Sequence, residues 1–224
     1  MEPRIRPADE KDVRPCGVIQ YEAFRGIAES RNFPPVFTDP EEPVSQLGMM
    51  QQAPHFDGFV AEADGEPIGS IWVSRRSPVA GISAVTVEPD VQDRGVGRTL
   101  MEHAMLHLEE QGHPRQQLVQ AAYHNRSLCL YAKLGFVATE MLSNMVGAPV
   151  DAEVPGRTIR QATGDDAEVC NTLCRQIHGF DRAREVEGAI QRGTARVVED
   201  ENEVTGYTTG VGFIGHGVGR SNED

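Results

Sequence analysis

The chain has 224 residues, 39% of them apolar and 25% charged, and a formal net charge of −13. The apolar fraction is enough to bury a core, which excludes an intrinsically disordered chain. The basic residues are scattered, whereas phosphate contacts need clustered Lys and Arg, so we expect no nucleic-acid partner. No window approaches the roughly 18 consecutive apolar residues of a membrane span, and the N-terminus lacks the apolar core of a signal peptide. We therefore expect a cytoplasmic protein without a membrane partner.

The first part of the chain predicts a helix followed by a hairpin and a strand. Apolar residues at helical spacing predict a helix over residues 9–31. Several prolines in residues 32–54 indicate a loop or a broken helix. An Asp-Gly turn between residues 59–63 and 67–74 predicts a hairpin. Residues 82–87 alternate as a strand, which the proline at position 89 ends.

The next part predicts alternating helices and strands. An apolar face begins near Val96 and predicts a helix that closes at Gly112. Residues 118–122 read as a strand, and residues 136–140 as the last one. The predicted helix between them has Asn125 as its cap, runs through Lys133 and ends with Gly135 in the left-handed conformation. The pattern predicts an α/β fold, a mixed and mostly antiparallel central sheet flanked by helices.

Two blocks of sequence recur in the same order. Residues 5–16 are similar to residues 159–170, and residues 60–69 are similar to residues 197–206. The two offsets differ only by a loop-sized deletion, which favours a duplicated unit. The predicted organisation is a complete domain (1–145), a linker rich in Gly and Pro (146–156) and an incomplete second copy (157–224).

The four cysteines form no Cys-X-X-Cys pairs, so we expect reduced thiols and no metal site. Cys170, Cys174 and His178 are spaced to lie on one helix face, but the apolar residues beside them favour core packing over metal ligation. We likewise favour packing over a nucleophilic pair for Cys129 and His124. Residues 210–215 match Gly-X-Gly-X-X-Gly, yet the βαβ context of a dinucleotide site is missing.

A glycine-rich loop follows the strand that ends at Val87. Glycines at positions 95 and 97 allow successive N–H groups to point outward at a helix N-terminus, where the positive end of the helix dipole can bind a pyrophosphate. Arg94 and Arg98 are available to neutralise the anion. The loop alone fits an ordinary strand-to-helix turn equally well.

The pattern Gln92-X-X-Gly95-X-Gly97 after a strand, followed by Asn125 and Tyr131-X-X-X-Gly135-Phe136, resembles the GNAT superfamily of acyl-CoA N-acyltransferases. The resemblance covers roughly residues 4–140. It implies a GNAT fold and an N-acetyltransferase that uses acetyl-CoA as cosubstrate and a primary amine of a small molecule or peptide as acceptor.

The resemblance also implies roles for individual residues. Backbone groups of residues 85–87 would bond the pantetheine arm, the N–H groups of residues 93–98 would hold the pyrophosphate, and Asn125 would contact the pantetheine or 3′ region. Tyr131 would lie by the thioester sulfur and protonate the departing thiolate. The residues expected to bind acetyl-CoA are Val85, Thr86, Val87, Gln92, Asp93, Arg94, Gly95, Val96, Gly97, Arg98 and Asn125.

Two departures from the family pattern leave the amine's deprotonation open. His124 stands at the usual position of the family asparagine, and Gln120 stands on the strand where many members carry a glutamate base. Glu88 is the base that we name, Glu22 is a second candidate, and deprotonation through water is at least as favoured. The alternative function is a non-catalytic CoA-binding or interaction module, and a homodimer is left open.

Aromatic residues of the first helix and the following loop, within residues 21–25 and 33–37, border the acceptor in the family. They are equally consistent with ordinary packing of a helix and a surface loop. Trp72, in the predicted hairpin, fits the acceptor cleft and the core equally well.

Overall fold

The computed structural model describes residues 3–142, 147–148, 154–212 and 215–224. The chain forms two compact units, and we describe each by itself. The first comprises residues 1–75 and 79–137, and the second comprises residues 76–78 and 138–224. Residues 146 and 149–153 of the predicted linker lie outside the described residues. The linker and the second copy over residues 157–224 stay predictions.

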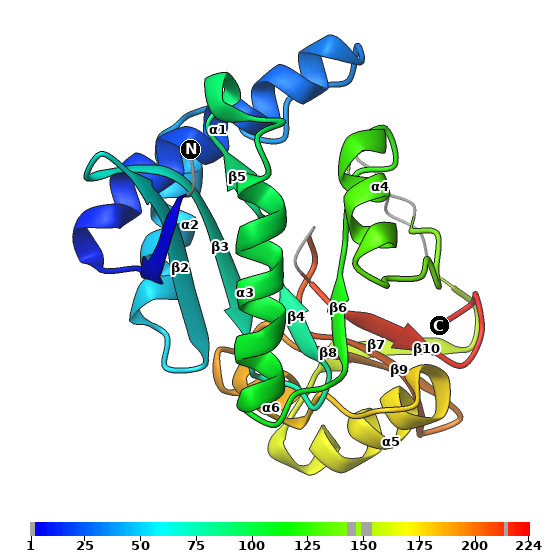
Figure 1. The fold of residues 1–224 in the computed structure, drawn as a ribbon. Helices are drawn as coiled ribbons and strands as arrows, with labels where there is room; N and C mark the ends of the chain where they lie inside the picture. Colours follow the sequence, from blue (N-terminus) through cyan, green and yellow to red (C-terminus); the bar gives the residue numbers. More distant parts are fainter. Residues whose placement is uncertain (1–2, 143–146, 149–153, 213–214) are drawn as a thin grey trace. The chain divides into compact units, whose positions relative to one another are not determined.

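The first unit is an α/β structure around one sheet (Figure 1). Its elements are β1 (Arg4–Pro7), the 3-10 turn η1 (Glu10–Asp12), α1 (Val13–Ser30), α2 (Glu41–Gln52), β2 (Phe56–Ala63), β3 (Glu66–Ser74), β4 (Ala80–Ile82), β5 (Thr86–Val87), the 3-10 turn η2 (Pro89–Val91), α3 (Val96–Glu110), β6 (Gln116–Leu118) and α4 (Asn125–Lys133). The strand order is β1-β2-β3-β4-β6, and β5 also pairs with β3. Among the described strands of this sheet the pairs are antiparallel except for β4 with β6. The predicted mixed, mostly antiparallel sheet flanked by helices is confirmed.

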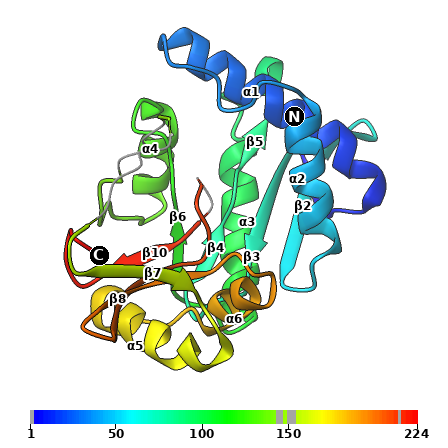
Figure 2. The ribbon, with the colours of Figure 1, turned by 180° about the vertical axis from the view of Figure 1, so that it is seen from behind.

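Helices cover both faces of this sheet because its strands alternate apolar side chains between the two sides. Helix α3 crosses one face in Figure 1 and packs Leu100 against Phe59 and Ala61 of β2. Helices α1 and α2 lie on the other face, which is toward the viewer in Figure 2, where they cover Val60 and Trp72. Trp72 is 1% exposed. It belongs to the core, which decides between its two predicted settings.

Helix α2 replaces the predicted loop or broken helix. Pro43 is the third residue of α2, in the first turn, where a missing N–H disrupts no intrahelical hydrogen bond. The carboxylate of Glu42 accepts hydrogen bonds from the backbone N–H groups of Thr38 and Asp39. Leu47 then anchors the helix, because it is almost fully buried against the sheet. Prolines therefore mark where this helix begins rather than break it.

Three predicted strands differ from the structure. The strand predicted over residues 82–87 is divided into β4 and β5, and Ser83 between them donates its N–H to the carbonyl of Trp72. The strand predicted over residues 118–122 is β6, which ends at Leu118, and residues 136–140 form no strand. Asn125 is the first residue of α4 rather than its cap, since His124 holds the cap position without a side-chain hydrogen bond.

The second unit is a four-stranded antiparallel sheet with two helices. Its elements are β7 (Arg157–Gln161), the 3-10 turn η3 (Gly164–Asp166), α5 (Ala167–His178), α6 (Ala183–Gln191), β8 (Arg196–Asp200), β9 (Glu203–Thr208) and β10 (Gly217–Gly219), with strand order β10-β9-β8-β7. Leu173 and Cys174 of α5 and Val186 of α6 pack against Val197 and Tyr207 of the sheet. The predicted core placement of Cys170 and Cys174 is confirmed by their burial.

Each unit contains the same ion-pair arrangement near its first strand. In the first unit, Arg6 contacts Asp12 and Glu62, both at 2.6 Å. In the second unit, Arg160 contacts Asp166 at 2.7 Å and Glu199 at 2.8 Å. The strand pairing also shifts register at the same place in both hairpins, between Ala61 and Glu62 and between Val198 and Glu199.

Candidate active site

The glycine loop joins β5 to α3 through an unusual backbone path. After η2, Gln92 is extended, and Asp93 and Gly95 have φ values of 62° and 89°, in the left-handed region. Helix α3 begins at Val96, which is buried, and its first backbone hydrogen bond runs from the N–H of Thr99 to the carbonyl of Gly95. The left-handed conformation at Gly95 turns the chain into the helix, which explains a residue without a Cβ at this position.

The loop presents a series of free hydrogen-bond donors. The N–H groups of residues 93–98 have no hydrogen-bond partner among the described residues. They lie at the N-terminus of a 15-residue helix, where the helix dipole favours negative charge. An anion-binding loop needs such donors, and the binding of a pyrophosphate here stays a prediction.

The two glycines of the loop differ in their requirements. Gly95 has open space around it but a positive φ. Gly97 is helical, and a Cβ there would be in ordinary contact with Val87, at 3.6 Å, and Leu130, at 3.9 Å. Only the first position therefore requires glycine for its backbone conformation, while the second lies close to the end of β5 and to α4.

The strand before the loop approaches β3 closely. Thr86 of β5 pairs with Ser70 of β3, and their hydroxyl oxygens are 3.5 Å apart in a buried position. A Cβ at Gly69 would lie 2.7 Å from the carbonyl oxygen of Thr86. Val85 and Val87 pack against the same apolar cluster as α3. The sheet therefore fixes the strand whose backbone groups were predicted to bind pantetheine.

The charged residues near the loop form ion pairs and hydrogen bonds with neighbouring groups. Arg98 pairs with Glu102 at 2.9 Å, and Arg94 donates to the carbonyl of Asp90 at 3.3 Å. The sequence analysis missed Arg126, whose guanidinium contacts the carboxylate of Asp93 at 3.0 Å. The separation of 33 residues between these partners explains the omission, because no local pattern connects them.

Arg126 also donates to the side-chain carbonyl of Gln92. The amide nitrogen of Gln92 in turn donates to the carbonyl oxygen of Val87 at 2.9 Å. The glutamine of the motif therefore connects the end of β5 with the start of α4.

Tyr131 lies on α4, and the same apolar cluster that holds Val85 and Val87 packs against it. Its ring meets that of Phe136 edge-on, with centroids 6.1 Å apart. Burial raises the pKa of Tyr131, and a hydrogen bond with Ser127 opposes this. The phenol therefore keeps its proton at neutral pH and can act as a hydrogen-bond donor. Beyond α4, Gly135 adopts the predicted left-handed conformation, with φ of 94°.

The polar residues considered as bases or CoA contacts differ in their burial and in their hydrogen-bond partners. Glu88 is half-buried, and its backbone N–H bonds to the carbonyl of Ile68 at 2.9 Å. Glu22 forms an exposed ion pair with Arg25 at 2.6 Å. Asn125 is exposed at the start of α4. The side-chain oxygen of Gln120 is buried and has no hydrogen-bond partner among the described residues.

Aromatic residues join the α1–α2 loop to the segment before α4. Phe33 stacks on Tyr123 with ring centroids 4.3 Å apart, and Phe37 meets Phe24 edge-on at 5.6 Å. The next residue after Tyr123 is His124. Its pKa is lowered by burial and by the positive charges of two arginines, at positions 126 and 31. The stack of Phe33 on Tyr123 holds the α1–α2 loop against the segment before α4, and a role of these rings beside an acceptor stays a prediction.

Several further groups show no sign of chemistry. Burial raises the pKa of Cys16 to about 11 and that of Cys170 to about 12, so both thiols are inert, whereas Cys129 is exposed. No group of three His, Cys, Asp or Glu side chains suited to a metal ion occurs among the described residues. Residues 213–214 of the Gly-X-Gly-X-X-Gly match lie outside them, and β10 follows this segment.

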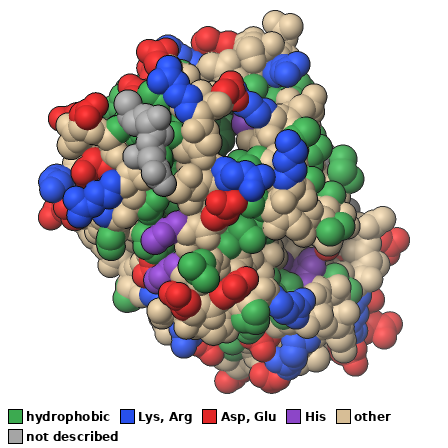
Figure 3. All heavy atoms as spheres, viewed as in Figure 1, with side chains coloured by type: hydrophobic (Ala, Val, Ile, Leu, Met, Phe, Trp, Pro, Cys, Tyr) green, Lys and Arg blue, Asp and Glu red, His purple; other side chains and the backbone are tan. Residues whose placement is uncertain are grey.

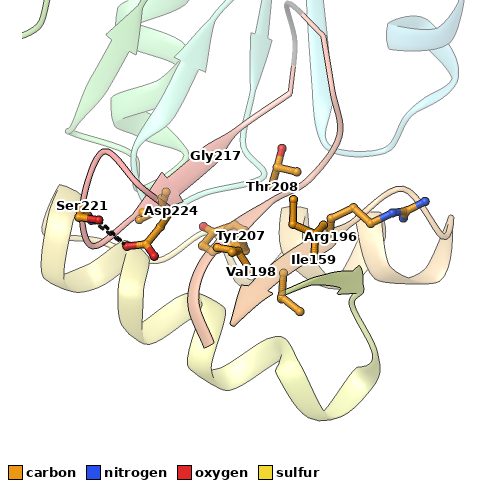
Figure 4. A pocket seen from close by; sticks show the side chains of 11 residues that line it. Ile159, Arg196, Val198, Tyr207, Thr208, Gly217, Ser221 and Asp224 are labelled. Carbon is orange, nitrogen blue, oxygen red and sulfur yellow. Dashed lines mark hydrogen bonds between the residues drawn. The ribbon is translucent and has the colours of Figure 1, made fainter. Parts of the chain in front are cut away.

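An open pocket of about 350 Å³ lies on the sheet of the second unit (Figure 4). Ile159, Val198 and Thr208 line it, together with Asp224, which accepts a hydrogen bond from Ser221 at 2.9 Å. None of the predicted acetyl-CoA residues lines this pocket.

Basic and acidic side chains are interspersed over the face drawn in Figure 3. In the part of the chain that the structure describes, every helix is too short or too polar to cross a membrane.

The sequence and the fold both resemble those of known acetyltransferases. The model of the acetyltransferase (GNAT) family matches residues 24–136, half of the chain. Mycothiol acetyltransferase from Streptomyces coelicolor is 36% identical over 84 residues, which cover 37% of this chain and 27% of that protein. The chain thus matches only about a quarter of this relative's length.

Solved structures show the same fold. The aminoglycoside acetyltransferase AAC(6')-Iy, bound to the bisubstrate analogue CoA-S-monomethyl-acetylneamine, has a TM-score of 0.54 at 20% identity and covers 66% of this chain and 100% of its own. A mutant of the BH1408 protein from Bacillus halodurans has a TM-score of 0.57 at 13% identity, covering 65% of this chain and 99% of its own. The family match, the motif residues and the fold together lead to one conclusion: the chain belongs to the GNAT acetyltransferase family.

Proposed function

We propose that the first unit transfers an acetyl group from acetyl-CoA to a primary amine. The observation that carries the proposal is the row of N–H groups in residues 93–98, at the N-terminus of α3, which have no partner in the described part of this GNAT-family chain. These donors and the left-handed Gly95 fit a pyrophosphate. Strand β5 pairs only with β3 among the described strands, so its other edge fits an extended pantetheine arm.

Acetyl-CoA would supply the activated acetyl group. Backbone N–H groups of residues 85–87 would polarise the thioester carbonyl as the amine attacks it. The carbon–sulfur bond then breaks, and the phenol of Tyr131 would give its proton to the departing sulfur. The raised pKa of Tyr131 supports this role, because the group remains protonated until a partner of suitable basicity forms beside it.

The deprotonation of the amine has two proposed routes. A lysine-like amine has a pKa of about 10.4 and must lose a proton before it attacks. Glu88 is half-buried at the end of β5 and is our proposed base, whereas Glu22 is occupied by its ion pair with Arg25. Loss of the proton through water is the second route.

The first experiment is calorimetric titration with acetyl-CoA, followed by acetyl transfer to a panel of amines, aminoglycosides, polyamines and peptides with release of the CoA thiol as readout. Tyr131→Phe should lower kcat at least tenfold while acetyl-CoA affinity changes little. Tyr207→Phe is the matched control, since Tyr207 is a buried tyrosine in the core of the second unit and is not among the residues proposed to bind acetyl-CoA. An absence of acetyl-CoA binding would rule out the proposal.

One observation favours a second candidate function. Many family members carry a carboxylate where this chain has Gln120, whose side-chain oxygen is buried without a partner among the residues described. A non-catalytic CoA-binding module would bind CoA as tightly but would acetylate no amine in the panel. In that case Tyr131→Phe would change neither binding nor thiol release.

We also propose that residues 157–224 are a second copy of the first half of the acetyltransferase fold. The repeated ion pairs of Arg6 and Arg160 and the matching register shifts in the two hairpins support this proposal. Limited proteolysis of the full chain tests it. A folded copy should resist cleavage after an initial cut near Gly156, and rapid loss of the whole fragment would contradict it.

A further inference from the structure

Arg126 holds two residues of the glycine loop from the first turn of α4. One guanidinium nitrogen lies 3.0 Å from the carboxylate of Asp93, and the other donates to the side chain of Gln92. Gln92 is itself bonded to the carbonyl of Val87. A single side chain therefore connects α4 with the loop and, through Gln92, with the end of β5.

This ion pair is weak enough to exchange. The side chain of Arg126 is 51% exposed and that of Asp93 is 73% exposed. Ion pairs at such exposure contribute little to stability, because water solvates both charges well in the separated state. A phosphate accepts the same paired, charge-assisted hydrogen bonds from a guanidinium as a carboxylate does, and a pyrophosphate carries more negative charge than the single carboxylate of Asp93.

Asp93 places a negative charge at the position where a pyrophosphate is proposed to bind. Its own N–H is the first of the unpartnered donors of residues 93–98. Of the nearby cations, Arg98 is paired with Glu102, and Arg94 bonds to a backbone carbonyl. Arg126 is therefore the cation in direct contact with Asp93, a residue that itself contributes one of these donors.

We propose that Arg126 is a pyrophosphate-binding residue of the acetyl-CoA site and that Asp93 holds it in place until the cosubstrate binds. Arg126 then exchanges the carboxylate of Asp93 for the pyrophosphate. The inference rests on the proposed function. Arg126 and Tyr131 belong to the same helix, α4. Binding of the pyrophosphate at the glycine loop would therefore change the contacts of the helix that carries the proposed proton donor.

The test measures binding of CoA and of 3′-dephospho-CoA to the full chain by calorimetry. Arg126→Ala should weaken CoA binding about tenfold or more, because it removes a charged phosphate contact. Asp93→Asn should tighten it by about threefold or more, because it removes a competing negative charge. Asparagine tolerates the left-handed conformation at this position, so the loop keeps its path. Arg14→Ala is the matched control, since it breaks an equally exposed ion pair with Glu41 and should leave binding unchanged.

The opposite signs of the two effects separate this proposal from a structural role. If the ion pair merely fastens the loop to α4, Arg126→Ala and Asp93→Asn break the same contact, and both weaken binding. That result, or the absence of any change, overturns the proposal. Arg126→Ala must weaken the binding of 3′-dephospho-CoA by the same factor as that of CoA, because both ligands contain the pyrophosphate. If it leaves 3′-dephospho-CoA binding unchanged, the assignment of Arg126 to the pyrophosphate is overturned. Failure of the unmodified chain to bind CoA would instead contradict the proposed function itself.

Discussion

Alanine substitution should lower the free energy of unfolding at Gly95 but not at Gly97. Gly95 has a φ of 89°, and no atom lies within 4 Å of the point that a Cβ would occupy. Gly95→Ala therefore meets no steric clash with neighbours, and only the left-handed backbone opposes it. That backbone penalty is about 1–2 kcal/mol for a residue with a Cβ. We expect Gly95→Ala to lower the free energy of unfolding by about this amount.

Gly97→Ala should be neutral or stabilising. The added methyl group would make ordinary contacts with Val87 and Leu130. Alanine is favoured over glycine in a helix interior by about 1 kcal/mol, and the gain is smaller in the first turn. The two variants should therefore differ by about 1–3 kcal/mol in the free energy of unfolding, although they stand two residues apart in the same motif.

Thermal unfolding of the full chain measures this difference. A change of 1 kcal/mol corresponds to a shift in Tm of about 2–4 °C for a chain of this size. We expect a fall of about 2–8 °C for Gly95→Ala and no fall for Gly97→Ala. Gly95→Asn should recover part of the loss, because asparagine adopts the left-handed conformation more readily than alanine.

The same variants test the anion site. Gly97→Ala keeps every N–H group of residues 93–98 and should bind acetyl-CoA within about twofold of the unmodified chain. Equal destabilisation by the two alanine substitutions, or a neutral Gly95→Ala, would refute the reasoning from backbone conformation.

Three further outcomes are expected. Asp12→Ala should lower the free energy of unfolding in urea by about 3 kcal/mol, because Asp12 is 1% exposed and its loss removes a partner of the half-buried Arg6. Glu41→Ala, which breaks an exposed ion pair, is the control, and an equally small effect of Asp12→Ala would contradict this prediction. Burial, together with nearby positive charge, lowers the pKa of His216 to about 3 in the folded chain, against about 6.5 in the unfolded chain. Between these two pH values the unfolded chain binds more protons than the folded chain, so the free energy of unfolding falls as the pH falls. The free energy of unfolding should be about 1–2 kcal/mol lower at pH 5 than at pH 7, and this difference should be smaller in His216→Gln. The same difference in His216→Gln would exclude His216 as its source. Cys129, the exposed thiol, should react rapidly with a disulfide reagent, and Cys129→Ser should abolish that fast phase, whereas a fast phase that persists would mean that a buried thiol opens readily.

The sequence alone determined the features that depend on neighbouring residues. The hairpin of β2 and β3, the start of α3 after Gly95 and the left-handed Gly135 all follow from turn chemistry and apolar spacing within a few positions. The mixed sheet and the candidate loop could be predicted for the same reason, together with the resemblance to the GNAT family. The roles of individual site residues remain predictions.

Only the tertiary structure decided features that depend on distant partners. Helix α2 is held in place by Leu47, which packs against the sheet, and its prolines lie at its start, where they break no intrahelical hydrogen bond. Trp72 is a core residue because α1 and α2 cover its face of the sheet. Arg126 reaches Asp93 because folding brings α4 beside the loop. Patterns of neighbouring residues do not predict such contacts. Their free energy arises only when segments far apart in the chain exclude water from each other or bring opposite charges together.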